Sequence, residues 1–291
     1  MTNDSPPAMQ TLPRAGTLIA VAPTGAETAK SDCPQLPTTL AELVETAVAC
    51  QAAGASLIHI HIRDADHQPS LDPFLLRETV QAVRERTSLV IQLSTGGNVH
   101  DPLEKRLTVL DAEPDSCSLT CGTTNFGDDV FLNPFPFMAQ LYQQAQEREI
   151  VPEFELFDLG HVAALRRLID AYGLPFGGKV HVDFITGVPG GMPGTPAALM
   201  AGVQALPRDV TSWAATGVGR SHLPIAATAL ASGGHLRVGM EDNLIYAKGR
   251  PVQHNDELVS RAADLARLMQ RPPLTTHEAR ALLSVKERRI A

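Results

Sequence analysis

The chain has 291 residues, 44% of them hydrophobic, and a formal net charge of −8. This length fits two average domains or one α/β barrel of about 250 residues, and the hydrophobic content is sufficient for a sizeable core. Lysine and arginine cluster only at 286–289, so the sequence gives no electrostatic support for nucleic-acid binding. No run of about 18 apolar residues predicts a membrane span.

The first segment, Met1–Arg14, is polar and rich in proline. Such a composition predicts a disordered tail, and we expect a single folded domain over residues 15–291. The tail lacks the charged start and apolar core of a secretory leader, and the cysteines form no CxxC pair. Both features favour a reducing cytoplasm; the cysteines are Cys33, Cys50, Cys117 and Cys121.

Short apolar or β-branched runs recur along the chain and predict eight strands. A stretch with helical spacing follows each run. The predicted strands are 17–25, 56–64, 88–97, 115–123, 151–158, 179–187, 211–219 and 235–243. The predicted helices are 40–53, 73–87, 102–110, 134–147, 161–172, 196–206 and 223–232, with 257–270 and 276–284 after the last strand.

Strands that alternate with helices predict βαβ units and a parallel sheet. Eight such units in a chain of this length favour a (β/α)8 TIM barrel with additional C-terminal helices. An open doubly wound sheet would need a glycine-rich nucleotide fingerprint after its first strand. The stretch "APTGAET" at 22–28 does not have that pattern.

The second predicted strand, "SLIHIHIRD", places two histidines on one face and isoleucines on the other. Successive same-face side chains lie about 6–7 Å apart along a strand, so His59 and His61 can share one cation. Glu241, at the end of the eighth strand, is the leading third ligand. Zn²⁺, Mn²⁺ and Fe²⁺ all accept two imidazoles and a carboxylate; the competing ligands are Glu155, His181 and Asp183.

Polar side chains gather where the predicted strands end. In a TIM barrel the reactive groups lie at the carboxyl ends of the strands. The sequence therefore predicts a polar site there, which includes Thr24 and Glu27, Ser94–Gly97, Ser118, Glu155, and the segment from Arg237 to Asp242.

Several of these stretches resemble, in order and spacing, the β-keto acid cleavage enzymes. The matching motifs are "APTGAETAKSDCPQLPTT", "GASLIHIHIRD", "IQLSTGG", "LTCGTTNFG", "PEFELFD", "GVGR" and "GGHLRVGMEDN". The resemblance covers about residues 17–286. It implies a zinc-dependent TIM barrel that forms a homo-oligomer, with a tetramer favoured. The implied reaction converts a β-keto acid and acetyl-CoA into acetoacetate and a new acyl-CoA.

The resemblance also implies roles for individual residues. His59, His61 and Glu241 match the zinc ligands of the family, and Asp242 and Arg237 match its catalytic pair. Glu155 falls in the motif that carries a further active-site acid. The positions that bind the substrate carboxylate are Ser94, Gly97 and Ser118, where the serine at 118 replaces an expected threonine.

The implied chemistry requires such groups. Zn²⁺ acts as a Lewis acid on the two chelating oxygens of a β-keto acid and makes the intervening methylene acidic. Asp242 is a suitable base for that proton, while serine hydroxyls and backbone amides suit the carboxylate. The odd spacing between Arg237 and Asp242 places them on opposite faces of a regular strand, so their pairing requires a bend at Gly239.

Glu27 matches an acid of the family's aminohexanoate enzyme, whereas many relatives carry arginine there. Because an unpaired charge in a pocket is costly, Glu27 predicts a β-keto acid with a cationic or strongly polar tail, such as a 5-amino-3-oxo acid.

Other readings of these residues remain open. The turn at 94–97 can simply end a strand, and Asp242 and Asn243 can cap the next segment. Arg237 can form a purely structural ion pair. The glycine- and proline-rich loop 186–196 can contact CoA or only form a turn. For the whole chain, the alternatives are a metal-dependent hydrolase of the amidohydrolase type and a non-catalytic barrel that binds metal or acyl-CoA. The former places its HxH on the first strand, not the second.

Overall fold

The computed structural model describes residues 16–287, and eight parallel strands in it close into a barrel. The barrel order is β1, β12, β11, β10, β9, β6, β5 and β2. The predicted (β/α)8 fold is therefore confirmed, while the predicted tail Met1–Arg14 lies outside the described residues. The strands are β1 (Ile19–Val21), β2 (Leu57–Ile60), β5 (Val90–Leu93), β6 (Ser116–Thr120), β9 (Val151–Leu156), β10 (Val180–Thr186), β11 (Val210–Gly217) and β12 (His235–Val238).

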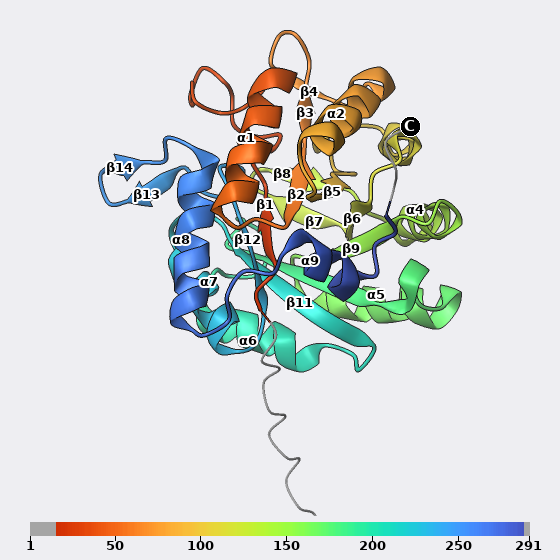
Figure 1. Cartoon of the computed structure of the whole chain (residues 1–291). Coiled ribbons are helices and arrows are strands. Elements are labelled where there is room, and N and C mark those ends of the chain that lie inside the picture. The colour runs from red at the N-terminus through yellow and green to blue at the C-terminus, as the bar shows by residue number, and fades with distance from the viewer. Residues whose placement is uncertain (1–15, 288–291) are drawn as a thin grey trace, which may run out of the picture.

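Helices surround the barrel and cover the outward faces of its strands (Figure 1). Most begin and end within two residues of the predicted bounds. Every helix in the described chain is too short or too polar to cross a lipid bilayer. The longer helices are α1 (Leu40–Ala53), α2 (Pro73–Arg86), α4 (Phe135–Glu147), α5 (Leu159–Tyr172), α6 (Pro196–Ala205), α7 (His222–Ala231), α8 (Asn255–Leu268) and α9 (Thr276–Leu283).

The segment 102–110, predicted as one helix, differs from the prediction. It forms a short helix, α3 (Leu103–Leu107), followed by a 3-10 turn, η1 (Thr108–Ala112). The Thr108 hydroxyl donates a hydrogen bond to the carbonyl oxygen of Lys105 at 2.8 Å. Such side-chain-to-backbone bonds compete with the regular helix ladder, so the α-helix ends early.

The alternation along β2 separates two environments, as the sequence predicted. Ile58 and Ile60 face outward into the large core between barrel and helices. Leu57 faces inward and joins a smaller cluster that closes the amino-terminal end of the barrel, where α9 packs through Ala279 and Leu283. His59 faces inward above Leu57 and is buried. The barrel interior therefore changes from apolar at one end to polar at the other.

Three short antiparallel pairs follow barrel strands at the carboxyl ends, and the sequence did not predict them. They are β3 (Ile62–Arg63) with β4 (Pro69–Ser70), β7 (Thr124–Phe126) with β8 (Asp129–Phe131), and β13 (Ile245–Ala247) with β14 (Arg250–Pro251). Because each of these strands is only two or three residues long, its hydrophobic alternation is too short to recognise in a sequence.

Candidate active site

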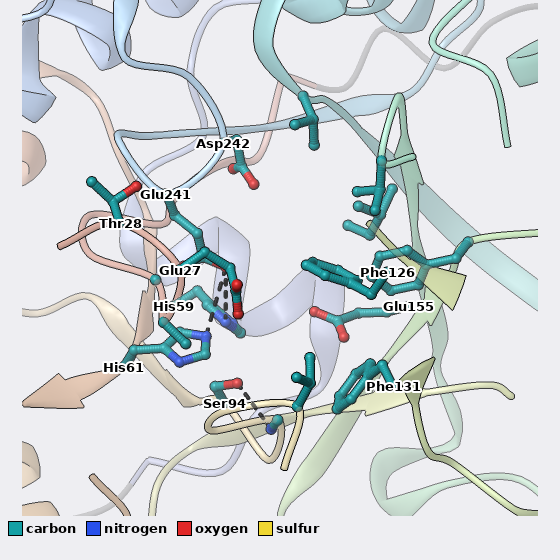
Figure 2. A pocket seen from close by; sticks show the side chains of 18 of the residues that line it. Glu27, Thr28, His59, His61, Ser94, Phe126, Phe131, Glu155, Glu241 and Asp242 are labelled. Atoms are coloured by element: carbon teal, nitrogen blue, oxygen red, sulfur yellow. Dashed lines mark hydrogen bonds and ion pairs between the residues drawn. The ribbon is translucent and has the colours of Figure 1, made fainter. Parts of the chain in front are cut away.

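A cavity of about 290 Å³ opens at the carboxyl ends of the barrel strands. The sequence predicted the reactive groups at this end. His59, His61 and Glu241 lie on one side of the cavity, and Phe126, Phe131 and Glu155 lie across from them (Figure 2). The predicted site residues that line the cavity are Glu27, His59, His61, Ser94, Gly97, Glu155, Arg237, Glu241 and Asp242.

His59, His61 and Glu241 converge on one point (Figure 2). The Nε2 atoms of His59 and His61 lie 3.9 Å and 3.6 Å from Oε1 of Glu241. One potential ligand atom from each residue lies within 4.8 Å of the other two. Gly25 makes room for this arrangement, because a Cβ on it would lie 2.6 Å from Cγ of Glu241.

The environment of these three side chains fits a bound cation. Oε2 of Glu241 is buried and has no hydrogen-bond partner in the described chain, so a ligand is needed to satisfy it. Burial lowers the pKa of His61 to about 4, which keeps its imidazole neutral, as metal ligation requires. Burial alone would raise the pKa of Glu241, but Arg237 and both imidazoles bring it down to about 2.

Gln92, on β5, orients His59, and the sequence reasoning missed it. Its amide nitrogen donates to the hydroxyl of Ser116 at 3.2 Å, which leaves its Oε1 facing Nδ1 of His59 at 2.5 Å. Nδ1 must therefore carry the proton, and Nε2 keeps the lone pair that a metal needs. Gln92 lies within the apolar run "VIQL", and no motif in the sequence marks it.

The competing ligands that the sequence left open have other partners. Thr120 donates to Glu155 at 2.7 Å. His181 contacts Glu153 at 3.3 Å, and Thr216 donates to Asp183 at 2.7 Å. None of the three competing ligands joins a cluster that could hold a metal within residues 16–287.

Arg237 lies at the centre of three carboxylates. Its guanidinium donates two hydrogen bonds of 3.1 Å to Asp242, one of 3.3 Å to Glu155 and one to Glu241. Burial would lower its pKa, but these carboxylates together raise it, so the guanidinium stays charged. Arg237 therefore forms ion pairs with three carboxylates, and all three of these carboxylates line the cavity.

The predicted bend at Gly239 makes the pairing of Arg237 with Asp242 possible. Gly239 has φ +152°, and β12 ends one residue before it. The amides of Asp242 and Asn243 both donate to the carbonyl of Gly239. The turn brings Asp242 back to Arg237, and burial raises the pKa of Asp242 to about 6 although Arg237 opposes this. The side chain of Asn243 hydrogen-bonds only to the backbone of Ile245.

The loop 94–97 borders the cavity next to His61. The hydroxyl of Ser94 accepts a hydrogen bond from the Gly96 amide at 3.0 Å, and Gly97 adopts φ +56° beside Asp101. Ser118 lies behind this loop. Its hydroxyl accepts from the Thr95 amide at 3.2 Å and does not line the cavity. The structure therefore brings Ser94 and Gly97 to the site and leaves Ser118 to support the loop.

Glu27 stands at the rim of the cavity on the loop after β1 and is exposed. Arg63 holds this loop, because its guanidinium donates to the carbonyls of Gly25 at 2.7 Å and Thr28 at 3.0 Å. Arg63 of the motif "HIHIRD" thus serves the neighbouring loop, while Asp64 accepts hydrogen bonds from backbone amides of its own turn.

The wall opposite the histidines is apolar, and the sequence reasoning did not identify it. It comes from the β7–β8 pair, the carboxyl ends of β9, β10 and β11, and the loop 186–196. This loop packs on the β7–β8 turn, where the Gly127 amide donates to the carbonyl of Pro189 at 2.9 Å. Its lining side chains are Phe126, Phe131, Phe157, Ile185, Val188, Pro189 and Val218.

Comparison with known proteins gives a consistent result over most of the chain. Residues 17–285 match the family model described as beta-keto acid cleavage enzyme. A 3-keto-5-aminohexanoate cleavage enzyme of Acetoanaerobium sticklandii is 35% identical over 93% of this chain and 98% of its own length. A 3-oxoadipate:acetyl-CoA acetyltransferase of Cupriavidus necator is also 35% identical, over 92% and 94% of the two chains.

Among solved structures, the apo form of ObcA superposes with a TM-score of 0.79 at 19% sequence identity. The match covers 87% of this chain and 66% of ObcA. At this identity the likeness supports the barrel fold and carries no further argument.

Proposed function

This chain belongs to the β-keto acid cleavage enzyme family, and we propose that it converts a β-keto acid and acetyl-CoA into acetoacetate and a new acyl-CoA. The observation that carries the proposal is the placement of Asp242 and Arg237 directly beside the His59, His61 and Glu241 cluster, in a cavity that also presents Ser94 and the 96–97 backbone. A base, a candidate metal centre and donors for a carboxylate therefore share one small space.

His59, His61 and Glu241 are the residues that would hold a zinc ion. Two neutral imidazoles and one carboxylate leave coordination positions open for substrate, as in catalytic zinc sites. A bound zinc ion would supply Lewis acidity toward the keto and carboxylate oxygens of the substrate.

Asp242 is the proposed base. It takes a proton from C2, the methylene between the two carbonyl groups, and Arg237 stabilises and orients its carboxylate through the paired hydrogen bonds. The C2 carbanion attacks the thioester carbon of acetyl-CoA, so a carbon–carbon bond forms and the CoA thiolate leaves. The thiolate then adds to the original keto carbon, the C2–C3 bond breaks, and Asp242 returns the proton to C2 of acetoacetate.

The Ser94 hydroxyl, which accepts from the Gly96 amide and keeps its own proton to donate, and the Gly97 amide are the proposed donors to the substrate carboxylate. Glu155 is held by Thr120 and Arg237, and we propose that its role is to support Arg237 at the site. Ser118 does not contact the substrate in this proposal, but supports the 94–97 loop by accepting a hydrogen bond from the Thr95 amide.

The tail of the substrate extends past Glu27 and the apolar wall. An anionic tail would meet the charge of Glu27, whereas a short chain with a cationic group can pair with Glu27 and pack against Phe126. This supports the 5-amino-3-oxo acid that the sequence predicted.

Two further proposals concern the setting of the enzyme. The four cysteines are free and buried, which supports a reducing cytoplasm. The family resemblance supports a homo-oligomer, with a tetramer favoured.

The decisive experiment combines elemental analysis of the purified protein with an acetyl-CoA-dependent acetoacetate assay over a panel of β-keto acids. We expect one zinc per chain and acetoacetate formation that requires acetyl-CoA. Asp242→Asn should lower kcat about 100-fold or more with zinc content unchanged. Zinc without CoA transfer would favour a metal-binding barrel, and fully active metal-free protein would contradict the metal role.

The tail assignment is tested separately. Wild type should prefer 5-amino-3-oxohexanoate over plain 3-oxohexanoate, and Glu27→Gln should reduce this preference about tenfold, as expected for loss of one charge-assisted contact. Preference of the wild type for the plain substrate would contradict the assignment.

A further inference from the structure

A second groove, of about 690 Å³, adjoins the active-site cavity. It lies between the loops that follow β11 and β12, the seventh and eighth strands of the barrel. The two spaces share Thr28, Val218, Glu241 and Asp242 as lining residues. A long ligand can therefore place its reactive end at Asp242 and continue along the groove.

The outer part of the groove carries positive charge. Arg220 and Lys248 line it and are exposed, and within the described chain neither makes an ion pair or a hydrogen bond through its side chain. The carboxylates at the inner end of the groove, Glu241 and Asp242, are both engaged by Arg237. This excess of cations stands out in a chain with a net charge of −8, and it favours an anionic ligand.

Arg261 adds a third cation beneath the groove. Its guanidinium lies 4.3 Å from the ring centroid of Tyr246 and donates to the Tyr246 carbonyl. Its Nε and Nη2 atoms are buried and have no partner in the described chain. The contact joins α8 to the β13–β14 pair, which projects from the barrel beside α8 (Figure 1). An anion in the groove would compensate this charge.

The floor of the groove fits an anion as well. Helix α7 begins there at His222, without a side-chain cap and without an acidic residue in its first turn. The amino end of a helix attracts negative charge. Before it, Gly219 has φ +58°, and a Cβ at that position would meet no atom within 4 Å. The loops after strands seven and eight frequently bind phosphate in TIM barrels.

We propose that this groove binds the phosphate groups of CoA, with Arg220 and Lys248 as direct contacts. The inference rests on the proposed function, which requires acetyl-CoA with its thioester near Asp242. The pantetheine arm then runs along the shared lining past Val218, and the nucleotide end lies toward β13–β14.

The test compares acetyl-CoA with acetyl-pantetheine, which has the same thioester but lacks the nucleotide and its phosphates. Wild type should have the larger kcat/KM for acetyl-CoA. In the double variant Arg220→Gln/Lys248→Gln this preference should fall at least about tenfold, through KM, because two charge-assisted contacts are lost. Both residues are exposed, so the variant should fold.

Arg267→Gln is the matched control. It removes one exposed positive charge from α8, where Arg267 pairs with Asp264 and does not line the groove, so the preference should persist. An unchanged preference in the double variant would overturn the inference. Failure of the proposed function would give a different result, because wild type would then form no product with any β-keto acid. In that case, calorimetric titration of CoA into wild type and the double variant tests whether the groove binds CoA. Equal affinities of the two proteins would overturn the inference.

Discussion

Gln92 determines which nitrogen of His59 faces the candidate metal centre. Its side-chain oxygen lies 2.5 Å from Nδ1, and Ser116 fixes the orientation of its amide. Outer contacts of this kind raise the basicity of a metal-bound imidazole and hold its ring in place. The strength of the site therefore depends on a residue that does not touch the metal.

We predict that Gln92→Leu lowers zinc affinity about 10- to 100-fold, because His59 loses the acceptor for its Nδ1 proton. Competition with a chromophoric chelator measures the dissociation constant. Gln92→Glu is the control, since a carboxylate also accepts this proton and should retain most of the affinity. Equal affinities in wild type and the leucine variant would show that the tautomer of His59 is set elsewhere.

At the scale of single residues, the sequence identified side chains whose chemistry is unusual for their position. Two histidines on one face of a strand and an acid at the end of another were recognised in this way, and they do converge. Gln92 and Arg106 could not be recognised, because an amide in a strand and an arginine in a helix are common. Ser118 matched a motif, yet its direction depends on how β6 and the 94–97 loop pack.

Arg106 connects elements that are far apart in the sequence. It is buried on α3, donates to the Thr95 carbonyl at 2.6 Å, and reaches the carbonyl of Leu132 and the side chain of Asn133 after β8. Its guanidinium also lies 4.6 Å from the ring centroid of Phe131. Arg106 thereby fixes the 94–97 loop relative to the apolar wall.

We predict that Arg106→Lys raises KM for the β-keto acid about tenfold and lowers the thermal midpoint, because lysine cannot make three divergent hydrogen bonds from one plane. Zinc affinity should stay unchanged, since Arg106 does not touch the histidines. Steady-state kinetics and a thermal scan measure both effects. Lys105→Gln, at the exposed neighbouring position, is the control, and an equal effect there would contradict the positioning role.

The end of β12 requires glycine at 239 for two reasons. Its φ of +152° is unfavourable for other residues, and a Cβ would lie 1.9 Å from the carbonyl oxygen of Ala22, in the segment that follows the adjacent strand β1. The close approach allows the turn that carries Glu241 and Asp242 into the cavity. The sequence predicted the need for a bend here from the spacing of Arg237 and Asp242.

We predict that Gly239→Ala destabilises the protein by several kcal/mol and removes measurable activity, because the backbone of β1 or β12 must move. Gly249→Ala is the control. Gly249 also has a positive φ of +76°, but a Cβ there meets nothing within 4 Å, so the cost should be only about 1 kcal/mol. Chemical denaturation measures both values, and similar losses would show that the contact with Ala22 relaxes easily.

At the scale of the whole molecule, β1 closes the barrel between β12 and β2. The eight-strand order followed from the alternation of strands and helices, since parallel neighbours need a crossover and right-handed crossovers repeat in one direction. The pairs β7–β8 and β13–β14 could not be predicted from the hydrophobic periodicity of the sequence. They nevertheless provide a wall of the cavity and a side of the groove.

The candidate ligands lie on both sides of this closure. His59 lies in β2, His61 directly follows this strand, and Glu241 follows β12. A cation bound by all three would therefore join the early and the late parts of the chain across β1. Since a ligand that binds only the folded state stabilises it, metal binding should contribute to the stability of the whole barrel.

We predict that zinc raises the thermal midpoint of the metal-free protein by roughly 10 °C. Free zinc at about 1,000 times its dissociation constant contributes about 4 kcal/mol, and a domain of this size gains about 2–4 °C per kcal/mol. Thermal scans after chelation and after reloading measure the shift. His61→Ala should show almost none, because two ligands hold the ion weakly. A shift of the same size in His61→Ala would mean that zinc stabilises the protein at another site, and a bound ion without any shift would mean that the three ligands remain together in the unfolded chain.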